Sequence, residues 1–527
     1  MFLWGYKKKI NFVNKSSLDN QLLYLLFIFV HIGLVWMLAY FPAQDGPSHI
    51  YNLVILKDLV NGGTEWGKFF SFQLRAVPNI AFTLFSYPLL QFFPPLVVEK
   101  IFISIYIVLM GAGVYIFLRT FNKTSLPFIY FVFPLIFNFN LMMGFYSYVI
   151  SVPIFLIAFS ISWKIRNRSA TYKFLLFNLT GCIIFYFHII PFVFFLLSLL
   201  CITIVQSKEF KRIIFDLIKL IIIISPSLLV LFLYLAKSTK SFIPDFSYLS
   251  SLSRYIYLRN DLFFFSTVTF SSWQMLPGFL FAGLFLSFFI LSVYILLKDP
   301  DEGWIKIRDI SASDKVLMCM TFIFLLIYFI TPFRFGGGDF FNQRFPWVVF
   351  IILLPLLRIN EKIVSKRFVW VSISSVAIIF FVFNTAILWQ QSNKVEEFLN
   401  GLNADIPKGA YVMTYKKIDP KAGLPRIDAL MHAASYYGIF KGCVDIGNYE
   451  TGPDYFPIKF KENIPSFPSL DQILYKSETI DWPAYPSIQY LLGWEINKND
   501  TEKLSKFFHV IWQNELLSIW QRNSINP

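Results

Sequence analysis

The sequence places a carboxylate and an imidazole close together, just beyond its first long apolar run. Asp45 follows that run by a few residues, and Asp45-Gly46-Pro47 is typical of the start of a helix. On such a helix His49 and Asn52, three positions apart, are neighbours. A carboxylate at this point could take a proton from a hydroxyl as a general base, with His49 beside it. It could equally cap the helix, with His49 as an ordinary interface residue, and the spacing leaves both interpretations open.

A second polar segment, residues 331–344, follows a later apolar run. It holds Arg334, Arg344, one aspartate and three consecutive glycines, and Arg344 immediately precedes the next apolar run. Arginine can bind a phosphate through two parallel hydrogen bonds, and glycine allows close approach of the backbone. The segment lacks the Gly-Lys-Ser/Thr sequence of a nucleotide-phosphate loop. It therefore predicts that Arg334 and Arg344 bind a phosphate at the depth of a lipid headgroup. Alternatively, either could be an arginine at a helix end whose side chain extends to the aqueous interface.

The remaining candidates are single residues near predicted turns. His188 lies between two apolar runs, where a histidine is costly unless it faces a polar cavity, so it could bind a phosphate or a sugar; a plain turn histidine is the alternative. Polar and aromatic side chains at the same side of the membrane could bind sugar hydroxyls, although interface belts and ordinary packing explain them too. The candidates for sugar or acceptor binding are Asn52, Asn138, Asn140, Tyr148 and His432.

The composition shows what kind of chain must position these residues. The 527 residues are 56% apolar, 20% aromatic and only 15% charged. A soluble domain has about 45–50% apolar and about 25% charged residues, so composition excludes a mostly soluble or disordered chain. The net charge of +14 comes with lysines and arginines in short connectors between apolar runs, which is how membrane proteins fix their orientation. We therefore expect membrane lipids and no nucleic acid as partners. The four cysteines do not form a disulfide framework.

The apolar runs predict an α-helical polytopic membrane protein. Four lysines precede the first run, so we expect no cleavable signal peptide and a cytoplasmic N-terminus. If every run crossed, the basic cluster at 164–168 would lie outside. The run at 79–97 is interrupted or flanked by four prolines, so we interpret it as re-entrant or interfacial, which leaves about eleven crossings. The twelve runs are 21–41, 79–97, 101–118, 125–138, 145–163, 172–187, 189–206, 213–235, 274–297, 315–332, 345–357 and 368–388.

The last part of the chain differs in kind. Residues 1–389 form the predicted transmembrane domain with an external loop at 42–78, and residues 390–527 have more charge and shorter apolar runs. Mixed helix and strand over this length predicts a small extracytoplasmic α/β domain. Its expected helices are 391–402, 428–440 and 499–507, and its expected strands are 409–415, 487–492 and a hairpin within 508–522.

This layout resembles the GT-C class of membrane glycosyltransferases, which includes protein O-mannosyltransferases and aminoarabinose transferases. The resemblance rests on the whole-chain layout and on the segment from Asp45 to His49. It implies a dozen or so membrane helices, a catalytic external loop, and Asp45 as the catalytic base or acceptor-orienting group. The class often has an Asp-Glu pair where this chain has Asp45-Gly46.

The expected function is transfer of a sugar from a polyprenyl-phosphate donor to a lipid, glycan or protein acceptor on the extracytoplasmic face. Such a site needs a base for the acceptor hydroxyl and cations for the leaving phosphate. The alternatives are a membrane polysaccharide polymerase or ligase, a lipid-carrier transporter or flippase, and a non-catalytic scaffold. One carboxylate is too few for a protein-built metal site, so no cofactor is predicted, with a divalent metal left open. A bacterial inner membrane is the expected location.

Overall fold

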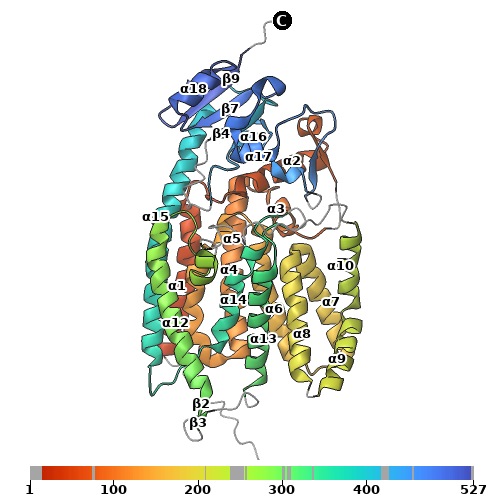
Figure 1. Cartoon of the computed structure of the whole chain (residues 1–527), viewed down its shortest axis with the longest axis vertical. Coiled ribbons are helices and arrows are strands. Elements are labelled where there is room, and N and C mark those ends of the chain that lie inside the picture. Colours follow the sequence, from red (N-terminus) through yellow and green to blue (C-terminus); the bar gives the residue numbers. More distant parts are fainter. Residues whose placement is uncertain are drawn as a thin grey trace, which may run out of the picture.

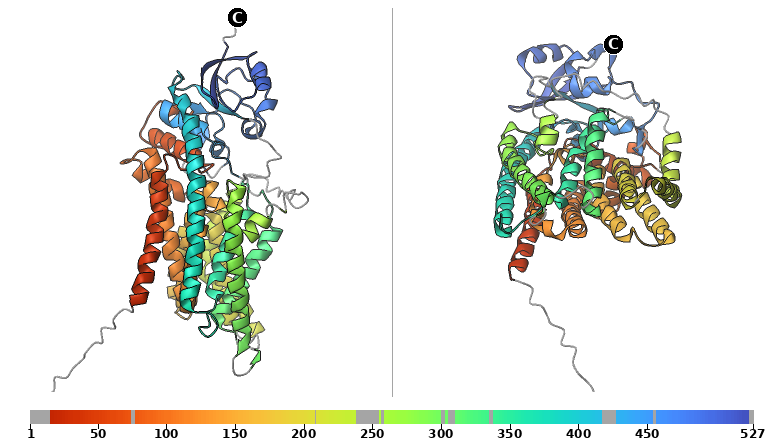
Figure 2. Two further views of the ribbon diagram at one scale, coloured as in Figure 1. Left: turned by 90° about the vertical axis from the view of Figure 1, so that its left-hand side faces the viewer. Right: turned by 60° about the horizontal axis from the view of Figure 1, so that its bottom comes forward.

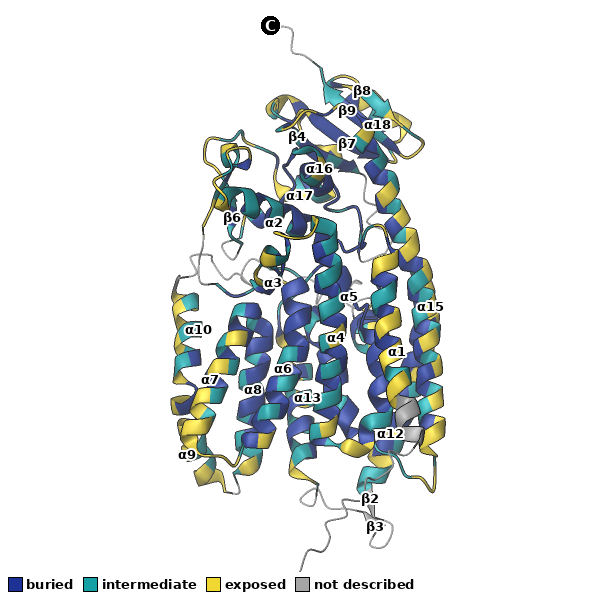
Figure 3. Ribbon diagram, turned by 180° about the vertical axis from the view of Figure 1, so that it is seen from behind, coloured by how far each residue is buried: buried dark blue, intermediate teal, exposed yellow. Residues whose placement is uncertain are grey.

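The protein is a bundle of long helices with an α/β domain at one end (Figures 1 and 2). The computed structural model describes residues 15–73, 77–207, 209–237, 255, 258–299, 303–304, 310–334, 338–416, 427–453 and 456–523. The outward faces of peripheral helices carry many exposed residues, whereas the bundle interior is buried (Figure 3). Exposed side chains on those faces include Phe29, Leu175, Phe232 and Phe322, as expected for a surface that lipid covers.

Within the described residues, eight helices are long and apolar enough to cross a membrane, and the pair α9–α10, bent by 70°, makes a ninth if it forms one broken span. Two shorter apolar stretches, 21–37 and 342–356, bring the apolar helical segments to eleven. Each coincides with one run predicted to cross, which confirms the polytopic helical fold. These elements are α1 (Lys15–Met37), α4 (Pro95–Phe121), the 3₁₀ helix η2 (Lys123–Leu135) with α5 (Phe139–Met142), α6 (Tyr146–Ile165), α7 (Ala170–Phe187), α8 (Ile189–Gln206), α9 (Phe210–Ile223), α10 (Ser225–Lys237), α12 (Met275–Leu297), α13 (Ala312–Ile330), α14 (Pro346–Leu353) and α15 (Lys366–Leu399).

The run at 79–97 does not cross. Its helix α3 (Ala81–Leu89) has nine residues and contains Pro88, and the chain turns before α4 begins at Pro95. Nine residues rise about 13 Å, less than half of the hydrocarbon core of a bilayer. The interpretation of this run as re-entrant or interfacial is confirmed, and the prolines give the reason.

The two ends of the bundle differ in what they carry. At one end lie α2 (Gly46–Val60), α3 and the C-terminal domain, whereas the hairpin of β2 (Lys298–Asp299) and β3 (Gly303–Trp304) lies at the opposite end (Figure 1). The basic cluster at 164–168, at the end of α6 and in its connector to α7, is also at that opposite end (Figure 1). The arrangement therefore places this cluster at the end away from the C-terminal domain, as the parity argument requires.

The C-terminal domain contains a five-stranded sheet in the order β5-β4-β7-β9-β8. Strand β4 is parallel to β5 and β7, and β9 is antiparallel to β7 and β8. The expected strands and terminal hairpin correspond to β4, β7, β8 and β9, but the helix expected at 391–402 is mostly the end of the long α15. The remaining elements are β4 (Tyr411–Lys416), α16 (Ala434–Lys441), β5 (Val444–Asp445), β6 (Ile458–Phe460), α17 (Leu470–Tyr475), β7 (Tyr490–Trp494), α18 (Lys498–Leu504), β8 (Phe508–Gln513) and β9 (Leu517–Arg522).

The C-terminal domain packs directly on the first loop. Helix α2 lies against α16, and Tyr51 of α2 donates a hydrogen bond to the backbone oxygen of Cys443 at 3.1 Å. Strand β1 (Phe70–Phe72) pairs with β6, with Phe70 opposite Phe460. Most of α2 is buried as a result, which explains why apolar residues lie on nearly every side of this helix.

The contact between α2 and α16 depends on a glycine, which gives a prediction for stability. A Cβ at Gly438 would lie 2.3 Å from the ring of Tyr51, whereas nothing lies within 4 Å of a Cβ at Gly283. Because α16 and Tyr51 are both well packed, we expect Gly438→Ala to destabilise the domain contact by about 1–3 kcal/mol. Thermal unfolding in detergent should show a lower midpoint for this variant. Gly283→Ala, a helical control, should show no loss; equal midpoints for the two variants would contradict the packing argument.

Candidate functional site

A cavity of about 630 Å³ opens where the first loop, the 331–344 loop and the C-terminal domain meet. Its lining combines side chains from both ends of the chain, although Asp45 and His432 are almost four hundred residues apart. Six of the predicted site residues line it: Asp45, His49, His188, Arg334, Arg344 and His432. The cavity thus brings together the carboxyl, imidazole and guanidinium groups that the sequence singled out separately.

The Asp45 carboxylate contacts Tyr449 and His432, and not the helix that follows it. Its side chain makes no capping hydrogen bond to the first turn of α2, all of which is described. Instead, the Tyr449 hydroxyl donates to Asp45 Oδ2 at 3.2 Å, and His432 Nε2 lies 3.5 Å from Oδ1. Asp45 therefore occupies the N-cap position of α2, where its backbone oxygen accepts from the His49 amide, but its carboxylate does not cap the helix and lines the cavity.

Burial is the main influence on the pKa of Asp45, and hence on its protonation state. The side chain is about 10% exposed, and burial raises its pKa to about 7, against the lowering effects of His49, Gln44 and Tyr449. A carboxyl with this pKa can hold or release a proton near neutral pH. His432 is neutral beside it, because burial and the charge on His49 lower the pKa of His432 to about 3.

The turn between α5 and α6 holds the backbone of Asp45. The Asp45 amide donates to the Met143 oxygen at 3.1 Å, and Gly144 has a φ of +88°. A Cβ at Gly144 would lie 2.8 Å from the Asp45 Cβ, so this position requires glycine for its conformation and for the close approach. Asn138 builds the same turn, since its Oδ1 accepts from the amides of Asn140 and Leu141.

His49 is held as a cation. Its Nε2 lies 2.9 Å from the Gly144 oxygen, and its Nδ1 lies 2.8 Å from Glu450 Oε1. With an acceptor at each nitrogen, both nitrogens carry protons. Burial alone would lower the pKa of His49, but Glu450, Asp45 and the Gly144 carbonyl together raise it. His49 is therefore a fixed positive charge near Asp45, which suits electrostatic support better than proton abstraction.

The Glu450–His49 pair gives a pH prediction. In Glu450→Gln the pKa of His49 falls, and Asp45 loses the positive charge that lowers its own pKa. Removing the Glu450 charge also removes a repulsion that raises the pKa of Asp45, but this effect is smaller than the effect of losing the His49 charge. The rate should then rise to its plateau at a higher pH than in the wild type, with about tenfold less transfer at pH 7 and a smaller loss at pH 8.5. Rate–pH profiles check this; a profile that scales down uniformly would mean a merely structural role.

His188 and Arg344 form the other side of the cavity. The Ile190 amide donates to His188 Nδ1 at 3.1 Å, and burial together with Arg344 holds the pKa of His188 well below its usual range. His188 Nε2 and Arg344 Nη1 are within hydrogen-bond distance of each other, at 3.0 Å. A guanidinium carries several further N–H donors, so an anionic oxygen in the cavity could accept from Arg344 beside this histidine.

Packing holds Arg344 in position. Its guanidinium lies over the ring of Phe145, 4.4 Å from the centroid, and the Tyr148 hydroxyl donates to its backbone oxygen. Trp347 Nε1 in turn donates to the Tyr148 hydroxyl at 3.1 Å. Tyr148 was expected to bind sugar; the structure places its hydroxyl between Trp347 and the Arg344 backbone.

Arg334 differs from Arg344. It forms a bidentate ion pair with Asp339, with distances of 2.6 and 3.0 Å, and its side chain is 58% exposed. A pair this exposed contributes little energy, and it neutralises the charge that a phosphate would need. Arg344 is therefore the stronger candidate of the two for anion binding.

The structure places three other predicted residues away from this cavity. Asn52 exchanges hydrogen bonds of 2.9 Å with Asn448 and so ties α2 to the C-terminal domain. Asn138 builds the α5 turn, and Asn140 is fully buried, with no hydrogen-bond partner for its side chain among the described residues.

Sequence reasoning missed several polar residues in and around the site. Asn79 lines the cavity, and Tyr449 and Glu450 come from the C-terminal domain; no local pattern marks them. Glu99 is buried in α4, where Tyr146 donates to it at 2.5 Å, and its carboxylate lies directly behind Gly46. Its signal was present, because a charged residue at the start of an apolar run is costly and deserved a functional hypothesis. Two further carboxylates thus lie near Asp45-Gly46, and both come from other segments of the chain.

No group of three or more His, Cys, Asp or Glu side chains within the described residues could hold a metal ion.

No family model matches the sequence, and no curated protein matches it. Two solved structures are similar in fold to nearly the whole chain. The structure of ArnT from Cupriavidus metallidurans bound to undecaprenyl phosphate has a TM-score of 0.46 and 9% identity, covering 98% of this chain and 99% of that one. The apo state of the same protein has a TM-score of 0.46 and 9% identity, covering 95% and 98%.

Proposed function

We propose that this protein is a membrane glycosyltransferase that moves a sugar from a polyprenyl-phosphate donor to an acceptor hydroxyl at the end of the bundle that carries the C-terminal domain. One observation carries the proposal. A buried carboxyl with a pKa near 7 and an arginine hydrogen-bonded to a histidine line the same cavity, at the end of a helical membrane bundle.

The proposed reaction is a single displacement. Asp45 takes the proton of the acceptor hydroxyl as its oxygen attacks the anomeric carbon. The bond between that carbon and the phosphate oxygen breaks, and its electron pair leaves with the phosphate. Arg344 and His188 hold the anion that develops there. The products are the glycosylated acceptor, free polyprenyl phosphate and a protonated Asp45, and the anomeric configuration inverts.

The residues around Asp45 support its role as a base. The positive charge on His49 favours the carboxylate over the acid, while burial keeps the pKa high enough for the carboxylate to be a useful base. The Tyr449 hydroxyl fixes one carboxylate oxygen at 3.2 Å. With Tyr449 and Glu450, the C-terminal domain contributes to the chemistry as well as to the wall of the cavity.

The acceptor side is also formed by the C-terminal domain. Leu470, Leu474 and Tyr475 of α17 line the cavity together with Tyr449. Apolar and aromatic side chains of this kind stack on sugar rings or cover a lipid chain. We propose that the acceptor enters along α17 and that the donor chain lies between the membrane helices. The proposed location is a bacterial inner membrane, with this end of the bundle extracytoplasmic.

The function is tested by incubating the purified protein in proteoliposomes with polyprenyl-phosphate hexoses and pentoses that carry a labelled sugar. Release of polyprenyl phosphate can be measured without knowing the acceptor, and membranes of the expression host supply acceptors. We expect labelled product and free polyprenyl phosphate from at least one lipid donor. Label moving from nucleotide sugars alone, or no release from any lipid donor, would overturn the proposal.

A further inference from the structure

Asn79 has a backbone conformation that is uncommon outside glycine, although asparagine adopts it more readily than most other residues. Its φ is +75°, in the left-handed region that favours glycine. The conformation is held from both sides: Ser147 Oγ donates to the Asn79 oxygen at 3.1 Å and accepts from the Phe82 amide, and the Ile80 amide donates to the Tyr186 oxygen. Left-handed non-glycine residues cluster at functional sites, where the surrounding structure maintains the strain.

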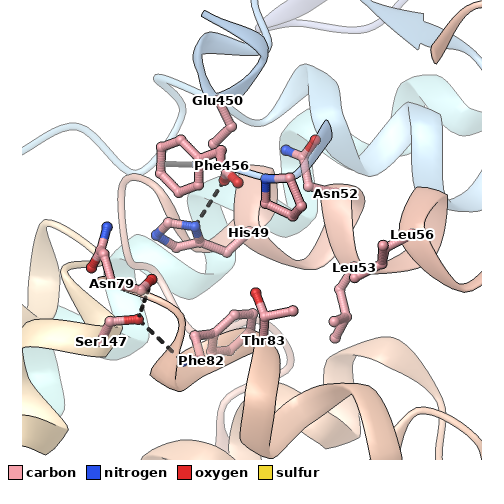
Figure 4. Close-up of a pocket in the computed structure, with 11 residues that line it drawn as sticks. His49, Asn52, Leu53, Leu56, Asn79, Phe82, Thr83, Ser147, Glu450 and Phe456 are labelled. Atoms are coloured by element: carbon pink, nitrogen blue, oxygen red, sulfur yellow. Dashed lines mark hydrogen bonds and ion pairs between the residues drawn. The ribbon is translucent and has the colours of Figure 1, made fainter. Parts of the chain in front are cut away.

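Asn79 lies in the wall of the cavity. It lines the large cavity together with the catalytic candidates Asp45 and His49 and the phosphate candidates His188 and Arg344. It also lines a small pocket of about 30 Å³, which His49 lines as well. In Figure 4 its carboxamide points away from Thr83, on the side of the His49 ring opposite Leu53.

We propose that the Asn79 carboxamide binds a hydroxyl of the donor sugar and so helps to determine which sugar the enzyme transfers. The inference rests on the proposed function. A sugar in transit must lie between the base and the leaving phosphate, and Asn79 shares the wall with both. A carboxamide offers a donor and an acceptor without charge, which matches a hydroxyl. A site built to bond a hydroxyl rejects an analogue that lacks it, because its own polar groups are left unpaired.

The competing explanation is that asparagine is present only because it tolerates a positive φ. Glycine adopts this conformation at least as readily, so Asn79→Gly keeps the backbone and removes the carboxamide alone. Glu495 provides a matched control. It also has a positive φ, of +51°, and it follows β7 in the C-terminal sheet, outside the lining of the cavity.

The experiment compares Asn79→Gly and Glu495→Gly with the wild type in proteoliposomes. We expect Asn79→Gly to lower kcat/KM for the preferred lipid donor by about 10- to 100-fold, while Glu495→Gly stays within about twofold. Binding of sugar-free polyprenyl phosphate should be unchanged in both variants. With deoxy donors, the difference between wild type and Asn79→Gly should nearly vanish for the analogue that lacks the bound hydroxyl.

Different results overturn different parts of the argument. If Asn79→Gly transfers at the wild-type rate with unchanged sugar preference, the role of Asn79 fails and the proposed function stands. If Asn79→Gly loses the same factor on every deoxy donor, or also loses affinity for sugar-free polyprenyl phosphate, the residue supports the fold or the phosphate site instead. If the wild type uses no polyprenyl-phosphate sugar, the proposed function itself fails.

Discussion

Replacing Asp45 with Asn lowers sugar transfer by about 10²- to 10⁴-fold, the range expected for loss of a general base. Asparagine keeps the size of the side chain and can still accept from Tyr449, but it cannot take a proton from the acceptor. Binding of the donor should change little, because in the proposed site the phosphate is bound by Arg344 and His188, which line the same cavity, and not by Asp45. The measurement is kcat for transfer, together with the affinity for polyprenyl phosphate.

The pH dependence of the wild type gives the second part of this prediction. Asp45 acts as a base only when ionised, and its pKa is about 7, so the rate should rise with pH and level off above about pH 8. The residual rate of Asp45→Asn should lack this rise. A variant that transfers normally, or one that keeps the wild-type pH profile, would show that another group is the base.

A suitable control is Asp471→Asn. Asp471 also lines the cavity, but it is exposed and pairs with Lys476 at 2.8 Å. An exposed carboxylate in such a pair keeps an ordinary environment, and its loss should change the rate by no more than a few fold. A large loss in this variant would mean that the total negative charge of the cavity matters more than one positioned base.

The membrane architecture could be predicted because lipid imposes simple rules on sequence. Each crossing needs a long apolar run, and basic clusters must share one side, so even the exclusion of 79–97 followed from counting charges and prolines. The strands of the terminal hairpin could be predicted for a similar reason, since short runs with β-branched and aromatic residues lie on both sides of a short turn.

The site was only half predictable, because its two halves meet through tertiary contacts. Asp45 stood out because it follows a membrane helix, whereas Glu450 and Tyr449 reach it from a domain that begins hundreds of residues later. The charge of His49 depends on Glu450, so its role could not be assigned from its spacing to Asp45. Tyr148 illustrates the same limit: a tyrosine near a turn suggested sugar binding, but only the packed structure shows its hydroxyl bonded to the Arg344 backbone and to Trp347.

Arg344→Ala should lower kcat/KM for transfer by about 10²- to 10³-fold, which is the typical loss when one positioned donor to a developing anion is removed. Unlike the Asp45 variant, it should also weaken binding of free polyprenyl phosphate, because the same group holds the product. Arg344→Lys keeps the charge but loses the planar fork, so it should recover only part of the rate.

Arg334→Ala is the matched control for this prediction, since Arg334 lines the same cavity but is exposed and already paired with Asp339. Its loss should reduce transfer by no more than a few fold. If Arg334→Ala is as damaging as Arg344→Ala, the anion is held by the general positive charge of the loop, and the Arg344–His188 pair is not what binds it. If only Arg344→Ala loses both rate and affinity, the Arg344 guanidinium beside His188 defines the phosphate position, and with Asp45 it defines the line along which the sugar is transferred.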